Sequence, residues 1–113
     1  PPRDVARAAA RGLELRKKFK RGGTPVGIKR AVQLARRDPV SVRTLQRMVS
    51  FFARHAVDRR PGWGNPRNPT NGYIAWMIWG GDPGRRWAIH ELARFKRMEA
   101  EAVGLASLLQ RLR

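Results

Sequence analysis

Basic side chains are the groups of this chain best equipped to engage a partner. The 113 residues carry 25 Lys plus Arg against 8 Asp plus Glu, which gives a formal net charge of +17. Twenty of the basic residues are arginines, and the planar guanidinium group grips phosphate or guanine through two parallel hydrogen bonds. High-GC coding also enriches arginine, so a coding origin stays open beside the functional one. The charge predicts a polyanionic partner.

This charge is concentrated in the first half of the chain. Residues 1–60 contain 17 basic and 4 acidic groups, a net of +13, whereas residues 61–113 contain 8 and 4, a net of +4. We expect thirteen side chains of the first half to contact nucleic acid. They are Arg16, Lys17, Lys18, Lys20, Arg21, Lys29, Arg30, Arg36, Arg37, Arg43, Thr44, Gln46 and Arg47. The group at residues 16–21 could equally be a solvated helix end whose cations interact with the helix dipole.

Catalytic chemistry finds little support in the sequence. The absence of cysteine excludes disulfides, thiolate metal sites and cysteine nucleophiles. His55 and His90 are the only histidines, and neither belongs to a His-Glu-x-x-His motif. The glycine-rich segment 80–86 lacks the Gly-Lys-Ser/Thr ending of a nucleotide-binding loop, although a helix start there would suit an anion. We therefore expect a non-enzymatic protein with no catalytic residue, no metal and no cofactor.

Apolar segments are short. No apolar run approaches the ~20 residues that span a bilayer, and the first residues contain no signal-peptide core. The sequence therefore argues against membrane insertion and secretion. The most apolar run, residues 73–79, predicts a buried central helix, with a buried strand as the alternative.

The spacing of apolar residues predicts that the charged side chains lie on helices. Apolar residues recur every three or four positions within residues 3–21, and two glycines end this segment. Thr24 followed by proline predicts the start of a second helix, and Ser41 predicts the start of a third that runs to about Ala56. Residues 57–72 are rich in proline and glycine, which predicts a loop.

We predict an all-α fold, a small bundle of about five helices with a long C-terminal helix. Asp82 followed by proline predicts the cap of that last helix. Residues 1–97 would form a basic helical domain with Trp63 and the aromatic run in its core. Residues 98–113 would form a C-terminal helix extension that either packs back along the bundle or projects to meet another chain.

Residues 34–47 resemble the helix-turn-helix signature of many DNA-binding proteins. Leu-Ala at 34–35 would close the support helix, and Val-Ser at 40–41 would open the recognition helix. The side chains expected to point outward and read base edges are Arg43, Thr44, Gln46 and Arg47. Pro39 stands where the motif normally has glycine, and proline cannot adopt the left-handed backbone of that turn. An ordinary angled pair of helices stays open as the alternative.

A second resemblance covers most of the chain, about residues 3–88. Its motifs are Arg-Gly-Leu-Glu-Leu-Arg at 11–16, Arg-Gly-Gly-Thr at 21–24, Arg-Met-Val-Ser-Phe-Phe-Ala-Arg-His at 47–55, Gly-Tyr-Ile-Ala-Trp at 72–76 and Trp-Gly-Gly-Asp-Pro-Gly-Arg-Arg-Trp-Ala at 79–88. Together they look like a small Arg-rich domain that recurs in tailed-bacteriophage proteins, sometimes attached to head-morphogenesis proteins. The resemblance implies a virion or DNA-handling role, in the virion or the bacterial host cytoplasm, and implies no catalytic residue.

Two functions of different classes follow as expectations. The first is a phage-type, non-enzymatic DNA-binding protein, with phosphate contacts from the Arg/Lys-rich helices and groove contact by helix 41–56. The second is a structural virion component, a head-lining, cement or capsid-attached protein that docks through its C-terminal helix. The expected partners are nucleic acid, DNA before RNA, then phage capsid or head proteins, and a second copy through residues 98–113. A ribosome- or RNA-associated protein is a third candidate.

Overall fold

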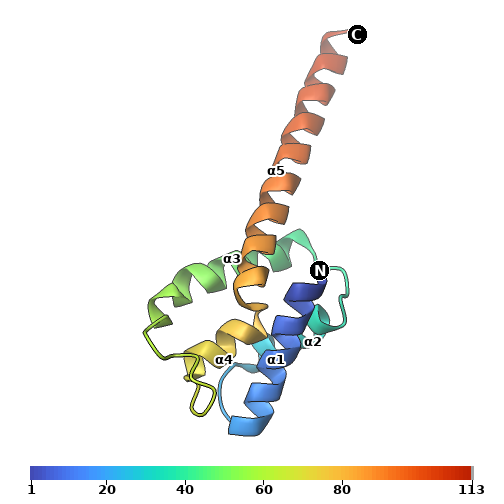
Figure 1. Cartoon of the computed structure of the whole chain (residues 1–113). Coiled ribbons are helices and arrows are strands. Elements are labelled where there is room, and N and C mark those ends of the chain that lie inside the picture. The colour runs from blue at the N-terminus through green and yellow to red at the C-terminus, as the bar shows by residue number, and fades with distance from the viewer. Residues whose placement is uncertain (113) are drawn as a thin grey trace.

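The computed structural model of the chain describes residues 1–112 and shows an all-α fold (Figure 1). That part of the chain contains five α-helices, one short 3-10 helix and no strand. The elements are α1 (Arg3–Phe19), α2 (Pro25–Ala35), α3 (Val42–His55), the 3-10 helix η1 (Ala56–Asp58), α4 (Asn71–Ile78) and α5 (Gly81–Arg111). The predicted fold class is confirmed, and so is the helical form of the apolar run near residue 76.

Three helices begin at side-chain caps. The Thr24 hydroxyl accepts a hydrogen bond from the Gly27 amide, and the Ser41 hydroxyl accepts one from the Thr44 amide, each at 3.1 Å. Thr70 caps α4 in the same way. Such caps satisfy amides that have no partner inside the helix. The caps predicted at Thr24 and Ser41 are confirmed.

The start of α5 differs from the prediction. The helix begins at Gly81, after Gly80 in a left-handed conformation with φ 108°. Asp82 therefore lies inside the first turn, and its role as a cap is wrong. Its carboxylate instead accepts hydrogen bonds from the Trp76 indole at 2.9 Å and from Arg59 at 2.6 Å. Asp82 thus joins α5 to α4 and to the segment that follows η1.

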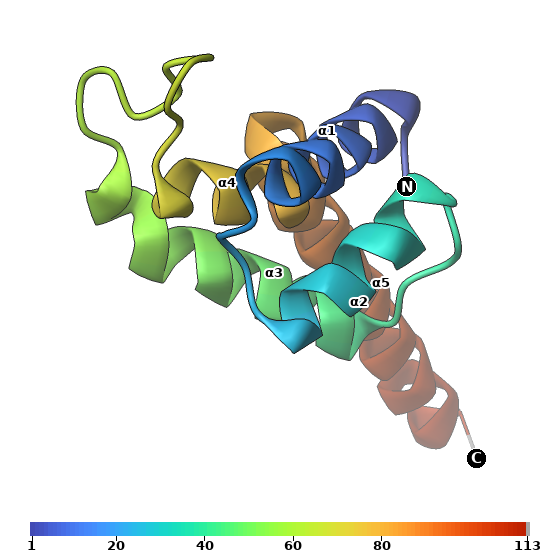
Figure 2. The same cartoon turned by 90° about the horizontal axis from the view of Figure 1, so that it is seen from below.

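The core lies where α1, α2 and α4 meet the pair formed by α3 and α5 (Figure 2). Its largest fully buried side chains are Val5, Leu34, Leu45, Met48, Phe52, Ile74, Trp76 and Ile78. Trp63 folds back from the 59–70 loop and packs edge-on against Tyr73 and Trp76, as predicted. The aromatic run therefore serves mainly as packing material.

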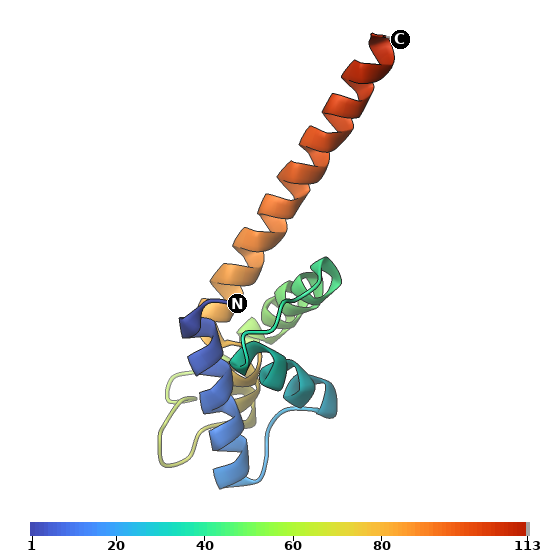
Figure 3. The same ribbon diagram turned by 90° about the vertical axis from the view of Figure 1, so that its right-hand side faces the viewer.

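α5 leaves the bundle and projects away from it (Figure 3). Only Gly81, Gly84 and Ala88 of this helix are buried, and Leu92 and Phe95 are the last side chains that pack against the core. Every residue from 96 to 112 is exposed. Of the two arrangements expected for the extension, the structure shows the projecting one, as a helix that continues without a break through residue 98.

Candidate nucleic-acid interface

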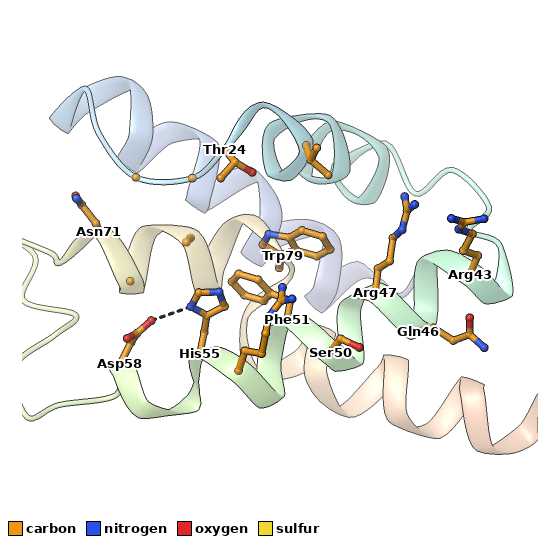
Figure 4. Close-up of a pocket in the computed structure, with 16 residues that line it drawn as sticks. Thr24, Arg43, Gln46, Arg47, Ser50, Phe51, His55, Asp58, Asn71 and Trp79 are labelled. Atoms are coloured by element: carbon orange, nitrogen blue, oxygen red, sulfur yellow. Dashed lines mark hydrogen bonds and ion pairs between the residues drawn. The ribbon is translucent and has the colours of Figure 1, made fainter.

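A groove of about 860 Å³ opens between α3, the start of α2 and α4 (Figure 4). One wall is the polar side of α3. The opposite wall consists of Gly22, Gly23 and Thr24, together with Val26 in the first turn of α2. Asn71 and nearby residues of α4 close one end.

The α3 wall is a stripe of polar side chains at helical spacing. The residues of α3 that line it are Arg43, Gln46, Arg47, Ser50, Phe51, Arg54 and His55. The other side of the helix carries the buried residues Leu45, Met48 and Phe52, so one amphipathic helix supplies both core and wall. Within residues 1–112 no ion pair joins Arg43, Arg47 or Arg54 to a carboxylate. These three arginines therefore present uncompensated positive charge to the groove.

Four planar side-chain groups stack on one another along the floor of the groove. The Phe51 and Trp79 rings are stacked, with centroids 4.8 Å apart and planes 12° apart. The Arg30 guanidinium lies 5.8 Å from the Trp79 ring on one side, and the His55 ring lies 4.5 Å from Phe51 on the other. Phe51 and Trp79 are 6% and 8% exposed, so they form a floor rather than an open platform.

The two ends of the stack of planar groups differ in charge. Burial, and then the positive charge of Arg47, lowers the pKa of the Arg30 guanidinium. The buried Nε of Arg30 has no hydrogen-bond partner among residues 1–112, while its Nη1 donates to the Gln33 side chain. At the other end the His55 Nδ1 lies 3.0 Å from the Asp58 carboxylate. Arg30 and Arg47 thus form a cationic pair, and Asp58 is the acid that lines the groove.

The glycines of the opposite wall are there because the loop packs tightly. Gly22 and Gly23 have φ of 88° and 78°, a backbone that other residues adopt only with strain. A side chain at either position would also approach Ile74 or Ile78 to 2.7 Å. This wall therefore presents backbone, the Thr24 hydroxyl and the Val26 side chain to the groove, with no acidic side chain.

The basic cluster at the end of α1 lies apart from this groove. Arg16, Lys17, Lys18 and Lys20 are exposed, and none of them lines it. Arg21 is half-buried, and its guanidinium donates to the side chains of Asn71 at 2.8 Å and Asn68 at 2.9 Å. Arg21 therefore holds the 59–70 loop against the end of α1, a structural role that its place in the sequence does not predict.

The cations of α2 and of the following connector are divided in the same way. Lys29, Arg36 and Arg37 are exposed and lie outside the groove. The Arg37 Nε donates to the Pro1 carbonyl at 2.9 Å, which ties the connector to the start of the chain. Of the thirteen predicted residues, the groove brings together Arg43, Gln46 and Arg47, with Arg30 behind them.

The prediction that Thr44 points outward is wrong. Thr44 is 8% exposed, and its hydroxyl accepts a hydrogen bond of 3.1 Å from the Ser41 hydroxyl. Thr44, Met48 and Phe52 are four residues apart, so all three lie on the buried face of α3. The predicted recognition surface mixed two faces of one helix.

The connection between α2 and α3 is not the tight turn of the usual helix-turn-helix. Six residues, 36–41, separate the helices, against three or four in that motif. The left-handed residue is Arg37, with φ 59°, and Pro39 cannot adopt that conformation. α2 packs mainly on α1, and α3 packs mainly on α5. A DNA-contacting helix-turn-helix therefore stays a prediction.

Several groove residues were absent from the predicted set. Ser50, Arg54, His55 and Asn71 all line the groove. The signal for Ser50 and Arg54 was present, because positions seven and eleven after Arg43 lie on the same face of a helix. His55 lies one turn after Phe51, which also lines the groove. Asn71 and the glycine loop come from distant parts of the sequence, and only the packing of α4 against α1 brings them close.

Residues 1–112 contain no group of three or more His, Cys, Asp or Glu side chains that could hold a metal ion. None of their helices is both long and apolar enough to cross a membrane. The chain matches no protein-family model, no curated protein and no solved structure.

Proposed function

We propose that this is a phage-type, non-enzymatic DNA-binding protein that holds phosphate groups along α3. One observation carries the proposal: Arg43, Arg47 and Arg54 line a groove, and no ion pair within residues 1–112 joins them to a carboxylate. Guanidinium groups in that situation favour an anion that accepts paired hydrogen bonds, and a phosphodiester is such an anion.

The cationic pair behind the groove strengthens this argument. Arg30 and Arg47 repel each other, and Arg30 is half-buried, where water screens the repulsion less than at the surface. A phosphate bound beside Arg47 would lower that energy. The exposed cluster of α1, at Arg16, Lys17, Lys18 and Lys20, would add sequence-independent contacts to a longer DNA molecule.

The absence of an enzymatic role is part of the proposal. His55 is oriented by Asp58, but within residues 1–112 no hydroxyl group hydrogen-bonds to its ring. A histidine that acts as a base needs a nucleophile or a substrate proton within such reach. We therefore assign His55 to the groove as a polar, planar side chain. DNA is preferred to RNA because of the resemblance to a phage domain.

A salt-titrated binding measurement tests this function. Wild-type protein should bind DNA with a log affinity that falls steeply against log salt, because each neutralised phosphate releases counterions. Arg43→Ala and Arg47→Ala should each make the slope shallower by about 0.7 to 0.9, the value for one phosphate. Arg97→Ala, which removes an exposed arginine of α5, is the matched control with a smaller change.

The outcomes separate the possibilities. If wild-type protein binds no DNA at low salt, the proposed function is wrong. If the α3 variants match wild type at every salt concentration, DNA binding does not use the groove. Tighter binding to an RNA of the same sequence would replace DNA by RNA as the partner.

The structural virion role is the second candidate, and α5 favours it. Beyond the bundle the chain exposes Leu105, Leu108, Leu109 and Leu112, each by more than half, and their spacing of three and four residues places them on one side of the helix. A patch of this kind commonly marks a protein contact. Removal of residues 98–113 discriminates: loss of co-sedimentation with virus particles while DNA binding persists favours the structural role, and the converse favours the DNA-binding role.

A further inference from the structure

The shape of the groove bears on which form of DNA can reach α3. Arg43, Arg47 and Arg54 line a hollow rather than a ridge, because the 22–24 loop and the start of α2 stand opposite them (Figure 4). A recognition helix enters the major groove of a duplex with its reading face outermost. Here α2 stands in front of part of that face.

We propose that the groove binds a segment of single-stranded DNA, with successive phosphates along the α3 arginines. The inference rests on the proposed function, which it narrows from DNA in general to one form of DNA. A single strand can lie between the two walls, whereas a rigid duplex meets α2 before its phosphates or base edges reach the middle of α3. Single-strand binding sites in other proteins are likewise positively charged grooves that follow the backbone.

The spacing along the helix suits this ligand. Arg43 and Arg47 are one turn apart, about 6 Å along the axis, and Arg54 lies about 10 Å further on. The groove of about 860 Å³ has the volume of a site for a small ligand of a few rings. We therefore assign it a few nucleotides rather than a long stretch.

Groups able to contact bases lie at the same place. The His55 side chain is 41% exposed and packs one face on Phe51, so its remaining surface can stack on a base. The amide groups of Gln46 and Asn71 also line the groove, and each can both donate to and accept from a base edge. Unpaired bases also expose their Watson–Crick edges, which base pairing occupies in a duplex.

One pair of substitutions tests the inference with matched charge. Ser50 and Ala53 are both exposed residues of α3, but only Ser50 lines the groove. In Ser50→Glu the new carboxylate lies three residues after Arg47 and four before Arg54, where it would neutralise both. Ala53→Glu makes the same change in net charge at an exposed position of α3 that does not line the groove. Affinity would be measured by fluorescence anisotropy for a short oligothymidylate and for a blunt duplex with the same number of nucleotides.

We expect a large loss of affinity only for Ser50→Glu and only with oligothymidylate. Ser50→Glu should weaken oligothymidylate binding by about tenfold or more, and the salt slope should become shallower by about 0.7 for each phosphate that the variant no longer neutralises. Ala53→Glu should change that affinity by less than about threefold. Duplex binding, which would use the exposed cations outside the groove, should respond equally to both variants.

The other possible outcomes overturn either the single-strand site or the proposed function. Equal loss of oligothymidylate binding in both variants, or a larger effect of Ser50→Glu on duplex than on single strand, overturns the single-strand site. Wild-type protein that binds only the duplex also overturns it, while the proposed function survives. Wild-type protein that binds neither ligand overturns the proposed function itself.

Discussion

Asp82 illustrates how one side chain connects three segments of this small protein. Its carboxylate accepts hydrogen bonds from the indole of Trp76 and the guanidinium of Arg59, and that guanidinium lies 5.2 Å from the Trp76 ring. Burial raises the pKa of Asp82, but the two hydrogen bonds and the charge of Arg59 outweigh it, so the pKa lies below its ordinary value. The ionised form therefore stabilises the fold.

We expect Asp82→Ala to lower the free energy of unfolding by about 1–3 kcal/mol, because the buried indole N–H of Trp76 would lose its partner. Chemical denaturation at neutral pH measures this. Since the pKa is lowered in the folded state, the difference from wild type should persist above the ordinary value of 3.8 and shrink as the pH falls below it. Glu99→Ala, at an exposed position of α5, is the control and should change stability by less than about 0.5 kcal/mol. A destabilisation that is independent of pH would contradict the role of the charge.

The roles of single side chains such as Arg21 were harder to predict from the sequence than the helix caps. Thr24 and Ser41 could be identified because a cap depends on neighbours a few positions away. The role of Arg21 could not, because its partners Asn68 and Asn71 are about fifty residues distant in the sequence. Thr44 was misplaced for a different reason: its side chain is short and polar, but its position belongs to the buried stripe. The spacing contained the orientation as well, because Thr44 lies four residues before Met48 of the buried stripe.

At the scale of elements, the crossing of α1 and α4 depends on Gly12. A Cβ at this position would lie 2.7 Å from the backbone carbon of Met77, closer than packed atoms approach. The two helices therefore meet backbone to backbone. Gly12 is one of the buried residues of α1, and which helix packs on it, and how closely, depends on the tertiary fold.

Gly12→Ala should destabilise the protein by about 1–3 kcal/mol, because the added methyl group forces the two helices apart. At an unconstrained helical position the same change is favourable by up to about 1 kcal/mol. Gly104 of α5 is such a position, since nothing lies within 4 Å of its Cβ direction, and Gly104→Ala is the matched control. Thermal unfolding followed by circular dichroism compares them. If both variants unfold at the wild-type temperature, the close crossing of α1 and α4 is wrong.

The elements themselves were predictable, whereas the groove was not. Apolar spacing, glycine and proline positions and caps located α1, α2, α3 and α5, because each of these signals is local. The run that forms α4 was predicted as a helix with a strand as the alternative. The groove requires α3 to face a loop that precedes it by some twenty residues and a helix that follows it by some twenty. The start of α5 shows the limit of local signals as well: Asp82-Pro83 resembles a cap, yet its carboxylate is occupied by Arg59 and Trp76.

At the scale of the molecule, the chain divides into a packed bundle and a projecting helix. The longest dimension is 66 Å, against 27 and 22 Å for the other two. Residues 96–112 are exposed throughout, and the core residues belong to the rest of the chain. The tip of α5 therefore contributes no side chain to the core.

We expect removal of residues 98–113 to leave the bundle folded, because every core side chain precedes this segment. The helical signal in circular dichroism should fall, while the unfolding temperature should change little. This outcome is the control for the particle-association experiment, since it shows that a loss of association reflects the missing tip. A truncated chain that no longer unfolds cooperatively would mean that the tip contributes to the bundle.

The projecting part of α5 also has a geometric consequence. The sixteen helical residues 96–111 extend about 24 Å, so this segment holds its last turn at a fixed distance from the bundle. The chain has no cysteine, and a single Gln110→Cys substitution would accept a fluorophore there. The efficiency of energy transfer from that dye to one on bound DNA would then report the distance between them, and so where along the bundle the nucleic acid lies.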